Sequence, residues 1–364
     1  TDNDGLPDTW EEANGLNKYN YTDAASDADN DGLTALEEFN LGTSPTKDDT
    51  DRDTLPDGWE VVNERNPLLA DYQFSMGVHH ACALDDNGVV CWGDNEYGQI
   101  DVPALNNPFQ ISLGHSHTCA IDDTGVVCWG RNSASQIIIP TLSNPTEVFS
   151  GYFHNCAIDD TGLVCWGSHI FGQINVPIFI SDPMQVSLGD YDTCALDDSG
   201  VWCFGRDNYV IPPLSNPTQV SVGTSHVCAL DDSGVICWGD NNYGKADVPT
   251  LINPTEVSAG GYHTCAIDES GVVCWGANHN FQTDVPFLRN PVQVSAGSAL
   301  SCALDDTGIV CWGDNNLGQI DVPNLIIDPD GDGFSNQGGA DAFPLDALEW
   351  LDTDLDGIGN NADV

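Results

Sequence analysis

The sequence predicts an all-β fold, a seven-bladed β-propeller, and three observations lead to this prediction. A unit of 34 to 38 residues recurs seven times, each unit contains two cysteines nine positions apart, and acidic residues gather outside the units at both ends of the chain. Self-similarity at a fixed period is typical of repeat architectures. Short strands repeated at such a period form a propeller, whose radial closure also protects the strand edges.

Each unit contains four expected strands. The first corresponds to residues 110–113, and the second to the apolar residues 82–84. The third corresponds to residues 89–93, which follow a turn rich in Asp and Gly. The fourth carries the sequence Ile-Asp-Val-Pro, as at residues 100–103 and 320–323. Four short strands in each of seven units define the blades of the predicted propeller.

The cysteine pairs are predicted to be disulfides within blades. The turn at residues 85–88 ends in Gly88, which supplies the left-handed conformation that closes a hairpin. This turn sets Cys82 opposite Cys91, and directly opposed Cβ atoms lie roughly 4.5–5.5 Å apart, close enough to bridge. Zinc is the rival interpretation, but zinc sites favour closer cysteines. The predicted pairs are Cys82–Cys91, Cys119–Cys128, Cys156–Cys165, Cys194–Cys203, Cys228–Cys237, Cys265–Cys274 and Cys302–Cys311.

The composition restricts the functions that the chain can have. Lys and Arg total 8 and Asp and Glu total 57, so the net charge is −49. Such a field repels nucleic acid and anionic lipid and attracts divalent cations. The paired cysteines indicate an oxidising compartment, because a reducing cytosol does not maintain disulfides. No apolar run approaches the ~20 residues of a membrane helix, so we expect an extracellular or cell-surface protein with no membrane span.

Residues 27–38 fit a calcium-binding loop. The segment reads Asp-x-Asp-x-Asp-Gly with glutamate at position twelve, which is the EF-hand pattern. Calcium takes about six to eight oxygen ligands on a sharply turning loop, and Gly32 provides the turn. Residues 49–60 repeat the pattern, with Thr54 where glycine is expected. The predicted ligands are Asp27, Asp29, Asp31, the Leu33 carbonyl and Glu38 in the first loop, and Asp49, Asp51, Asp53, the Leu55 carbonyl and Glu60 in the second.

Three further acidic sets resemble this pattern in part. Asp2, Asp4 and Glu11 match it without its first ligand, so we expect the chain to be part of a longer precursor. Near the other end, Gly339 occupies position twelve of one set, and Asp341 is the expected substitute. The alternative is that the acidic ends form a disordered linker. The predicted C-terminal ligands are Asp328, Asp330, Asp332, the Phe334 carbonyl and Asp341, followed by Asp352, Asp354, Asp356, the Ile358 carbonyl and Asp363.

The segment after the second cysteine resembles a known family. Trp-Gly followed by Gly-Gln, at residues 92–99, 166–173 and 312–319, resembles the RCC1 repeat. The segment His-x-Cys-Ala-Leu is similar to the His-x-x-Ala-Leu strand of that family. The resemblance covers about residues 70–327 and implies a seven-bladed propeller. It also implies protein binding, which is the main activity of the secreted bacterial members, whereas the eukaryotic namesake acts in nucleotide exchange and chromatin binding.

The acidic ends resemble the thrombospondin type 3-like tracts of Gram-negative surface proteins. Residues 6–11 read Leu-Pro-Asp-x-Trp-Glu, and residues 343–346 read Phe-Pro-Leu-Asp. This resemblance implies Ca²⁺ as the bound ion and small loop–helix segments at both ends of the chain. We therefore expect an EF-hand-like or thrombospondin type 3-like segment at 1–66, the RCC1-like propeller at 67–327, and a second calcium-binding segment at 328–364.

Five histidines recur two positions before the first cysteine of a unit, and two interpretations are open. They could line a ring that binds a metal or senses pH. The simpler interpretation is a structural hydrogen bond within the blade or to its neighbour. The Asp-Asp pairs of the turns, such as Asp122-Asp123, suit turn geometry, so we do not expect them to be catalytic. The histidines are His80, His117, His154, His226 and His263, while Asp192 and Leu300 take this position in the other two units.

The sequence predicts a protein that is not an enzyme. It has no nucleophile elbow, no zinc-protease motif and no phosphate-binding loop. We expect a calcium-binding structural or interaction protein of a bacterial surface, whose partner is another protein or copies of itself. Metal-binding arms at both ends of a ring would support head-to-tail contacts and hence a filament. The alternative is a secreted binding module for a soluble protein or glycan, similar to an inhibitor or an adhesin.

Overall fold

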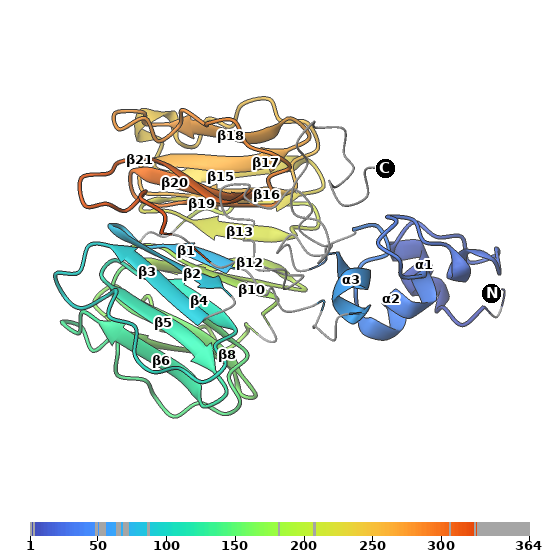
Figure 1. Cartoon of the computed structure of the whole chain (residues 1–364), viewed down its shortest axis with the longest axis horizontal. Helices are drawn as coiled ribbons and strands as arrows, with labels where there is room; N and C mark the ends of the chain where they lie inside the picture. Colours follow the sequence, from blue (N-terminus) through green and yellow to red (C-terminus); the bar gives the residue numbers. More distant parts are fainter. Residues whose placement is uncertain are drawn as a thin grey trace, which may run out of the picture. The chain divides into compact units, whose positions relative to one another are not determined.

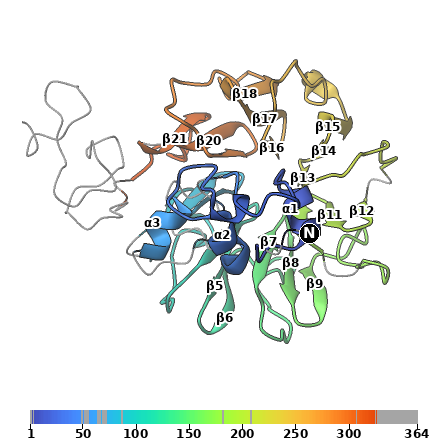
Figure 2. The same ribbon diagram turned by 90° about the vertical axis from the view of Figure 1, so that its right-hand side faces the viewer.

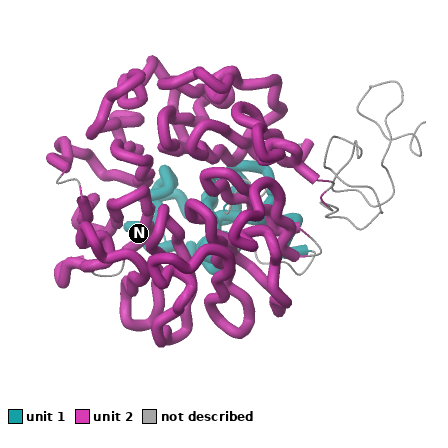
Figure 3. Tube along the Cα trace, turned by 90° about the vertical axis from the view of Figure 1, so that its left-hand side faces the viewer, with its two compact units in different colours: residues 1–72 teal, residues 73–364 magenta. Residues whose placement is uncertain are grey.

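The computed structural model describes residues 2, 4–47, 50, 56–62, 67, 73–85, 88–180, 183–206, 209–305, 307–323 and 325. The chain divides into two compact units, Thr1–Tyr72 and Gln73–Val364 (Figure 3). The predicted domain limits at 66 and 327 stay predictions. Among the helices described, none combines the length and the apolar character that crossing a membrane requires.

The first unit consists of short helices joined by acidic loops (Figure 1). α2 begins at a capping box: the Thr34 hydroxyl accepts from the Glu37 N–H, and the Glu37 carboxylate accepts from the Thr34 N–H. Gly42 ends this helix at a φ of 90°, a left-handed conformation that favours glycine. The helices are α1 (Asp8–Ala13), η1 (Asp23–Ala25), α2 (Ala35–Leu41) and α3 (Asp57–Val62).

The second unit is the predicted seven-bladed propeller. Its strands form seven separate three-stranded antiparallel sheets, which follow one another around a ring (Figure 2). We number the blades in chain order, so that blade 1 holds β1–β3 and blade 7 holds β19–β21. The strands are β1 (Gln73–Met76), β2 (His80–Asp85), β3 (Gly88–Gly93), β4 (Gln110–Leu113), β5 (His117–Asp122), β6 (Gly125–Gly130), β7 (Glu147–Ser150), β8 (His154–Asp159), β9 (Gly162–Gly167), β10 (Gln185–Leu188), β11 (Asp192–Asp197), β12 (Gly200–Gly205), β13 (Gln219–Val222), β14 (His226–Asp231), β15 (Gly234–Gly239), β16 (Glu256–Ala259), β17 (His263–Asp268), β18 (Gly271–Gly276), β19 (Gln293–Ala296), β20 (Leu300–Asp305) and β21 (Gly308–Gly313); a short helix, η2 (Asn242–Gly244), follows β15.

The hairpin register and the disulfides are as predicted. In blade 2, Cys119 faces Cys128 and Asp122 faces Gly125, whose φ is 111°. The carboxylate of Asp122 accepts hydrogen bonds from the backbone N–H and the hydroxyl of Thr124 inside the turn. All seven predicted disulfides form, and the described residues include no free cysteine.

The prediction of a fourth strand in each blade is wrong. Residues 101–105 are not part of any sheet, and neither are residues 321–323. The Val102 N–H donates to the Ile100 carbonyl at 3.0 Å in a tight turn, and Pro103 has no N–H to offer a ladder. Val102 packs instead against an apolar cluster that blades 1 and 2 share. The segment therefore fills the space between blades.

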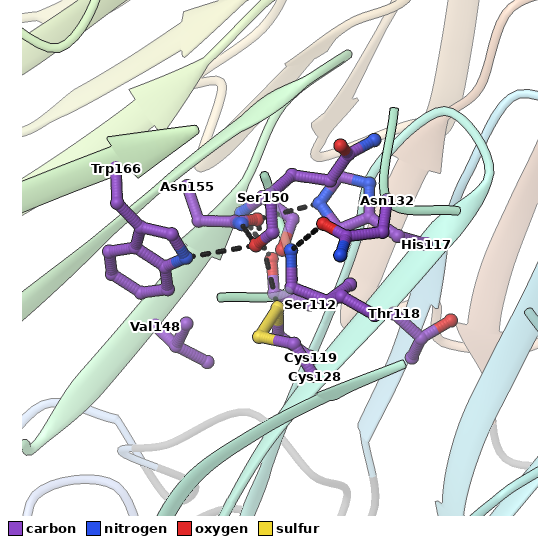
Figure 4. The surroundings of a disulfide bond; sticks show 12 residues. Ser112, His117, Thr118, Cys119, Cys128, Asn132, Val148, Ser150, Asn155 and Trp166 are labelled. Atoms are coloured by element: carbon purple, nitrogen blue, oxygen red, sulfur yellow. Dashed lines mark hydrogen bonds between the residues drawn. A yellow bond between two sulfur atoms is a disulfide. The ribbon is translucent and has the colours of Figure 1, made fainter. Parts of the chain in front are cut away.

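The innermost strand of each blade pairs with one strand only, and in blades 2, 3, 5, 6 and 7 side chains of the preceding blade cap its other edge. The Gln110 side-chain oxygen accepts from the Val148 N–H at 2.7 Å. The Ser112 hydroxyl accepts from the Ser150 N–H at 2.9 Å (Figure 4). This pattern explains why the units repeat Gln-x-Ser, because an unpaired strand edge needs hydrogen-bond partners. The same pattern recurs at the N–H groups of Val220, Val222, Val257, Ala259, Val294 and Ala296.

Candidate functional site

An acidic cluster surrounds Glu11 of α1. One carboxylate oxygen each from Asp2, Asp4, Glu11 and Asp23 lies within 4.8 Å of the others. Glu11 is 0% exposed, and neither of its oxygens has a hydrogen-bond partner in the described part of the chain. Burial raises the pKa of Glu11, and the charges of Asp2 and Asp4 raise it further. Buried carboxylates without donors need a cation or protons to balance their charge.

A second acidic cluster combines the predicted loop with α3. Asp31 belongs to one group with Asp27 and Asp29 and to another with Glu38 and Asp57, each group having oxygens within 4.8 Å of one another. Glu38 is 0% exposed, and both of its oxygens lack a hydrogen-bond partner among the residues that the structure describes. Burial, followed by the charges of Asp29 and Asp31, raises the pKa of Glu38 to about 8. The cluster therefore disfavours ionised carboxylates unless a cation joins them.

Both clusters suit calcium by the chemistry of their donors. Every side chain that they contribute is a carboxylate, and calcium prefers oxygen ligands, whereas zinc prefers nitrogen and sulfur. Gly32 has a φ of 101°, so the loop turns where the EF-hand pattern requires it. A bound calcium would supply the positive charge that the buried carboxylates of Glu11 and Glu38 lack.

Asp23 and Asp57 are the members of these clusters that sequence reasoning missed. Both lie beyond the twelve-residue window of the EF-hand pattern, so no pattern within one loop could include them. Glu60 lies in α3 and is buried. The other predicted ligands lie outside the described residues, namely Asp49, Asp51, Asp53, Leu55, Asp328, Asp330, Asp332, Phe334, Asp341, Asp352, Asp354, Asp356, Ile358 and Asp363.

The five recurring histidines form hydrogen bonds between blades. In Figure 4, His117 points toward Asn155 of the next blade, and the His117 Nε2 lies 2.7 Å from the Asn155 Oδ1. Burial lowers the pKa of His117 to about 4, so the ring is neutral. The interpretation as structural histidines agrees with these contacts. The pairs are His80–Thr118, His117–Asn155, His154–Thr193, His226–Thr264 and His263–Ser301.

These pairs belong to a larger set of contacts that we call the inter-blade clasp. Ser301 donates its hydroxyl proton to the Gln282 carbonyl at 2.9 Å, so His263 must be the donor to Ser301. Trp312 donates its Nε1 proton to the same carbonyl at 3.0 Å. The histidine, the hydroxyl or amide residue, the tryptophan and the loop carbonyl therefore hold two blades together. The tryptophan supports blade packing in this way.

The junction of blades 4 and 5 departs from this arrangement. Asp192 takes the histidine position, and the Tyr209 hydroxyl lies 3.4 Å from its Oδ2. The buried Trp238 Nε1 has no hydrogen-bond partner among the described residues, although the tryptophans of other blades donate to a carbonyl in the loop of the preceding blade. Phe204 replaces tryptophan in blade 4 itself.

One face of the propeller carries exposed apolar side chains at a repeated position. His80 faces Gly93 in blade 1, so the loop after β3 and the turn between β1 and β2 lie at the same end of the sheet. We call the face formed by these loops the exit-loop face. Four blades expose a large apolar side chain at the fourth position after Gly93 or its equivalent, and a fifth blade does so one position later. These residues are Tyr97, Phe171, Tyr243, Leu317 and, one position later, Phe281.

A cavity of about 520 Å³ lies on the propeller axis, among the turns that belong to this face. His115 and Tyr152 line it from two blades, with ring centroids 4.0 Å apart. Asp190 lines it from another blade, and burial raises the pKa of Asp190 to about 6 against the opposing charge of Arg206. Beside the cavity, the Arg131 guanidinium lies 4.9 Å from the ring centroids of Tyr97 and Phe153. Aromatic rings, arginine and polar groups thus meet at the mouth.

Five segments of the chain match the family model of the Regulator of chromosome condensation (RCC1) repeat. They cover an inner strand, the cysteine hairpin and the start of the exit loop in blades 1, 2, 5, 6 and 7. Five of the seven blades of the second unit therefore contain RCC1-like repeats. A comparison with curated proteins gives no match. The matching segments are residues 72–99, 110–136, 218–245, 255–282 and 292–319.

Solved structures show the same fold at low sequence identity. The CRINKLY WD40 ectodomain of the Arabidopsis thaliana receptor kinase ACR4 is 24% identical, with a TM-score of 0.58, and the match covers 69% of this chain and 98% of that one. The ectodomain of the Physcomitrella patens receptor kinase CR4 is 21% identical, with a TM-score of 0.56 and coverages of 66% and 73%. Prp20p of Saccharomyces cerevisiae is 15% identical, with a TM-score of 0.55 and coverages of 68% and 84%.

Proposed function

We propose that this chain is a non-enzymatic extracellular protein of a bacterial surface, which binds a protein partner through the exit-loop face and binds calcium through its acidic segments. The observation that carries the proposal is the repeated exposure of apolar side chains on that face. Folded proteins rarely expose contiguous apolar surface without a binding role. Seven disulfides support an oxidising extracellular compartment.

The composition of the exit-loop face suits a protein interface. Tyr97 and Tyr243 are 42% and 59% exposed, and Arg131 stacks on Tyr97. Tyrosine, tryptophan and arginine dominate the residues that contribute most to binding at protein interfaces. The loops that present them vary among blades, while the strands beneath keep one register. This division between a constant scaffold and variable loops is common in binding proteins.

Proteins with similar folds support protein binding. Two of the similar structures are receptor-kinase ectodomains, and the study of Prp20p describes its binding to Gsp1p and histones. We propose a protein partner for this chain as well. Its net charge of −49 favours a partner without excess negative charge, and disfavours nucleic acid.

The absence of catalysis is part of the proposal. The buried histidines donate to side chains in the clasp, and burial keeps His80 and His154 neutral by lowering the pKa of each to about 3. Histidines held in this way support blade packing and do not shuttle protons near pH 7. The aspartates of the hairpin turns accept backbone hydrogen bonds, as Asp231 does from the Ser233 N–H, and so shape the turn.

The experiment compares two faces of the full, oxidised chain. Crosslinking to extracellular protein of the source organism identifies the partner, and biolayer interferometry then measures its affinity. We expect Y97S/Y243S on the exit-loop face to weaken binding at least ~10-fold. The control is I252S/F287S, which removes two exposed apolar side chains that precede the next blade, 53% and 86% exposed. Loss of binding in the control together with retention in Y97S/Y243S would overturn the assignment of the face.

Two kinds of partner are compatible with this face, and one observation separates them. A second copy of the chain would make head-to-tail contacts and form a filament, with calcium holding the acidic segments in shape. A different soluble protein or a glycan would form a saturable complex with single propellers. Electron microscopy in calcium buffer and in chelator distinguishes these cases, because single particles under both conditions exclude the filament.

A further inference from the structure

Asp57 belongs to the second EF-hand-like segment, residues 49–60, yet its carboxylate lies beside ligands of the first loop, residues 27–38. It is the first residue of α3 and is 0% exposed. Its carboxylate lies with those of Asp31 and Glu38 in one group whose oxygens are within 4.8 Å of one another. Glu38, also 0% exposed, contributes an oxygen to this group, and neither of its two oxygens has a hydrogen-bond partner among the described residues. A buried carboxylate without donors indicates that a cation belongs there.

The start of α3 packs directly on the backbone of the loop. The Gly58 N–H donates to the Asp31 Oδ2 at 3.1 Å. A Cβ atom on Gly58 would lie 2.2 Å from the Asp31 carbonyl oxygen, so only glycine fits at this approach. The Thr50 N–H and hydroxyl donate to the two oxygens of Asp57, at 2.8 Å and 2.6 Å, and hold the carboxylate in place. The approach of α3 to the loop is therefore specific.

We infer that Asp57 is a ligand of the cation held by the loop at residues 27–38, so that one bound calcium joins this loop to α3. The inference rests on the proposed calcium binding. The loop would supply about six oxygens, from three aspartates, one carbonyl and a bidentate Glu38, and Asp57 adds one more within the range of about six to eight that calcium accepts. Added carboxylate charge raises the calcium affinity of such sites.

A ligand shared between two motifs couples them. Calcium that binds the loop also binds α3, so calcium stabilises the docked helix, and any change that displaces the helix weakens calcium binding by the same free energy. The sequence Leu-Pro-Asp precedes both α1 and α3, so Asp8 at the start of α1 is equivalent to Asp57 at the start of α3. Asp8 belongs to neither acidic cluster, and it therefore serves as a matched control. Calcium binding to the loop at residues 27–38 and docking of α3 on that loop would therefore be coupled.

The test uses the full, disulfide-bonded chain and calcium chloride as the probe. Isothermal titration measures affinity and stoichiometry for wild type, D57N, G58A and the control D8N. We expect D57N to weaken one site at least ~10-fold, and D8N to match wild type. G58A keeps every carboxylate, but its methyl group has no space where α3 packs on the Asp31 carbonyl, so we expect this variant to weaken the same site. The loss should occur even though alanine favours a helix over glycine by about 1 kcal/mol.

Hydrogen–deuterium exchange supplies a readout that a general loss of stability would not imitate. Calcium should protect the amides of residues 57–62 in wild type and in D8N, but not in D57N. The amides of the propeller strands should exchange alike in all four proteins. Equal calcium affinity and equal protection of α3 in wild type, D57N and G58A would overturn the inference and leave calcium binding intact. No calcium binding by wild type at millimolar concentration would instead overturn the proposed calcium binding itself.

Discussion

Single buried hydrogen bonds carry much of the specificity between blades. His263 of blade 6 donates to Ser301 of blade 7 at 2.7 Å, and both side chains are 0% exposed. At the junction of blades 7 and 1, Leu300 takes the histidine position and Ala81 the hydroxyl position, so an apolar pair replaces the polar one. The closing junction thus replaces the polar pair with an apolar one, and it is consistent because both partners change together.

This contrast predicts the result of a double-mutant cycle. S301A leaves the His263 Nε2 proton buried without an acceptor, and should cost about 1–3 kcal/mol. H263L/S301A reproduces the pair of the closing junction, and should recover most of that loss, because replacing both partners by apolar groups is nearly neutral. Urea unfolding of the oxidised chain measures both values. A double variant no more stable than S301A would contradict the argument.

At the scale of the element, close packing at the axis dictates the end of each inner strand. The glycine after β7, Gly151, has no room for a side chain, since a Cβ atom would lie 2.6 Å from the Gly189 carbonyl of the next blade and 2.8 Å from the His154 ring. Glycine occupies this position in all seven blades. The blades approach one another through backbone, and the histidine ring fills the remaining space.

The neighbouring residue supplies the control for a prediction at this position. G151A should destabilise the propeller by about 1–3 kcal/mol, as overpacking of a filled core does. S150A alters the adjacent residue of the same strand, whose buried hydroxyl oxygen has no hydrogen-bond partner among the described residues, and should be close to neutral. Thermal unfolding compares the two variants with wild type. Equal stability of G151A and S150A would contradict the argument, because it would mean that the axis has room for a side chain at residue 151.

Local sequence signals predict the elements that they control directly. The turn length sets Cys119 opposite Cys128, so the register and the disulfides follow from counting. The prediction of a fourth strand was wrong because Val102 packs in an apolar cluster between two blades. The sequence of one repeat unit does not show contacts with the next unit. Asp57 was missed for a similar reason: its approach to Glu38 depends on how α3 packs on the loop, and no spacing in the sequence expresses that contact.

At the scale of the molecule, the ring closes without exchange of a strand among the residues that the structure describes. Every blade takes its three strands from one continuous segment, and β1 contacts β19 where blade 7 meets blade 1. Trp92 donates to the Gln319 carbonyl at 3.0 Å, as the tryptophans of other blades donate to the preceding loop. The junction that closes the ring therefore has the same tryptophan contact as other junctions, with the apolar pair Leu300 and Ala81 in place of a histidine and its partner. The sum of such junctions determines the stability of the whole ring.

Five buried histidines make the stability of the propeller dependent on pH. Burial lowers the pKa of each from 6.5 to about 3 or about 4, so the folded ring stays neutral while the unfolded chain takes up protons below pH 6.5. The unfolded state then binds more protons, and stability falls as pH decreases toward 4. Each histidine contributes up to about 1.4 kcal/mol per pH unit in this window. Urea unfolding at fixed calcium, from pH 7.5 to 4.5, should show a progressive loss. H263L/S301A keeps four such histidines, so its stability should fall less steeply with decreasing pH than that of wild type. If the stability of wild type did not change with pH, or fell equally steeply in both proteins, the buried histidines would not be the cause of acid unfolding.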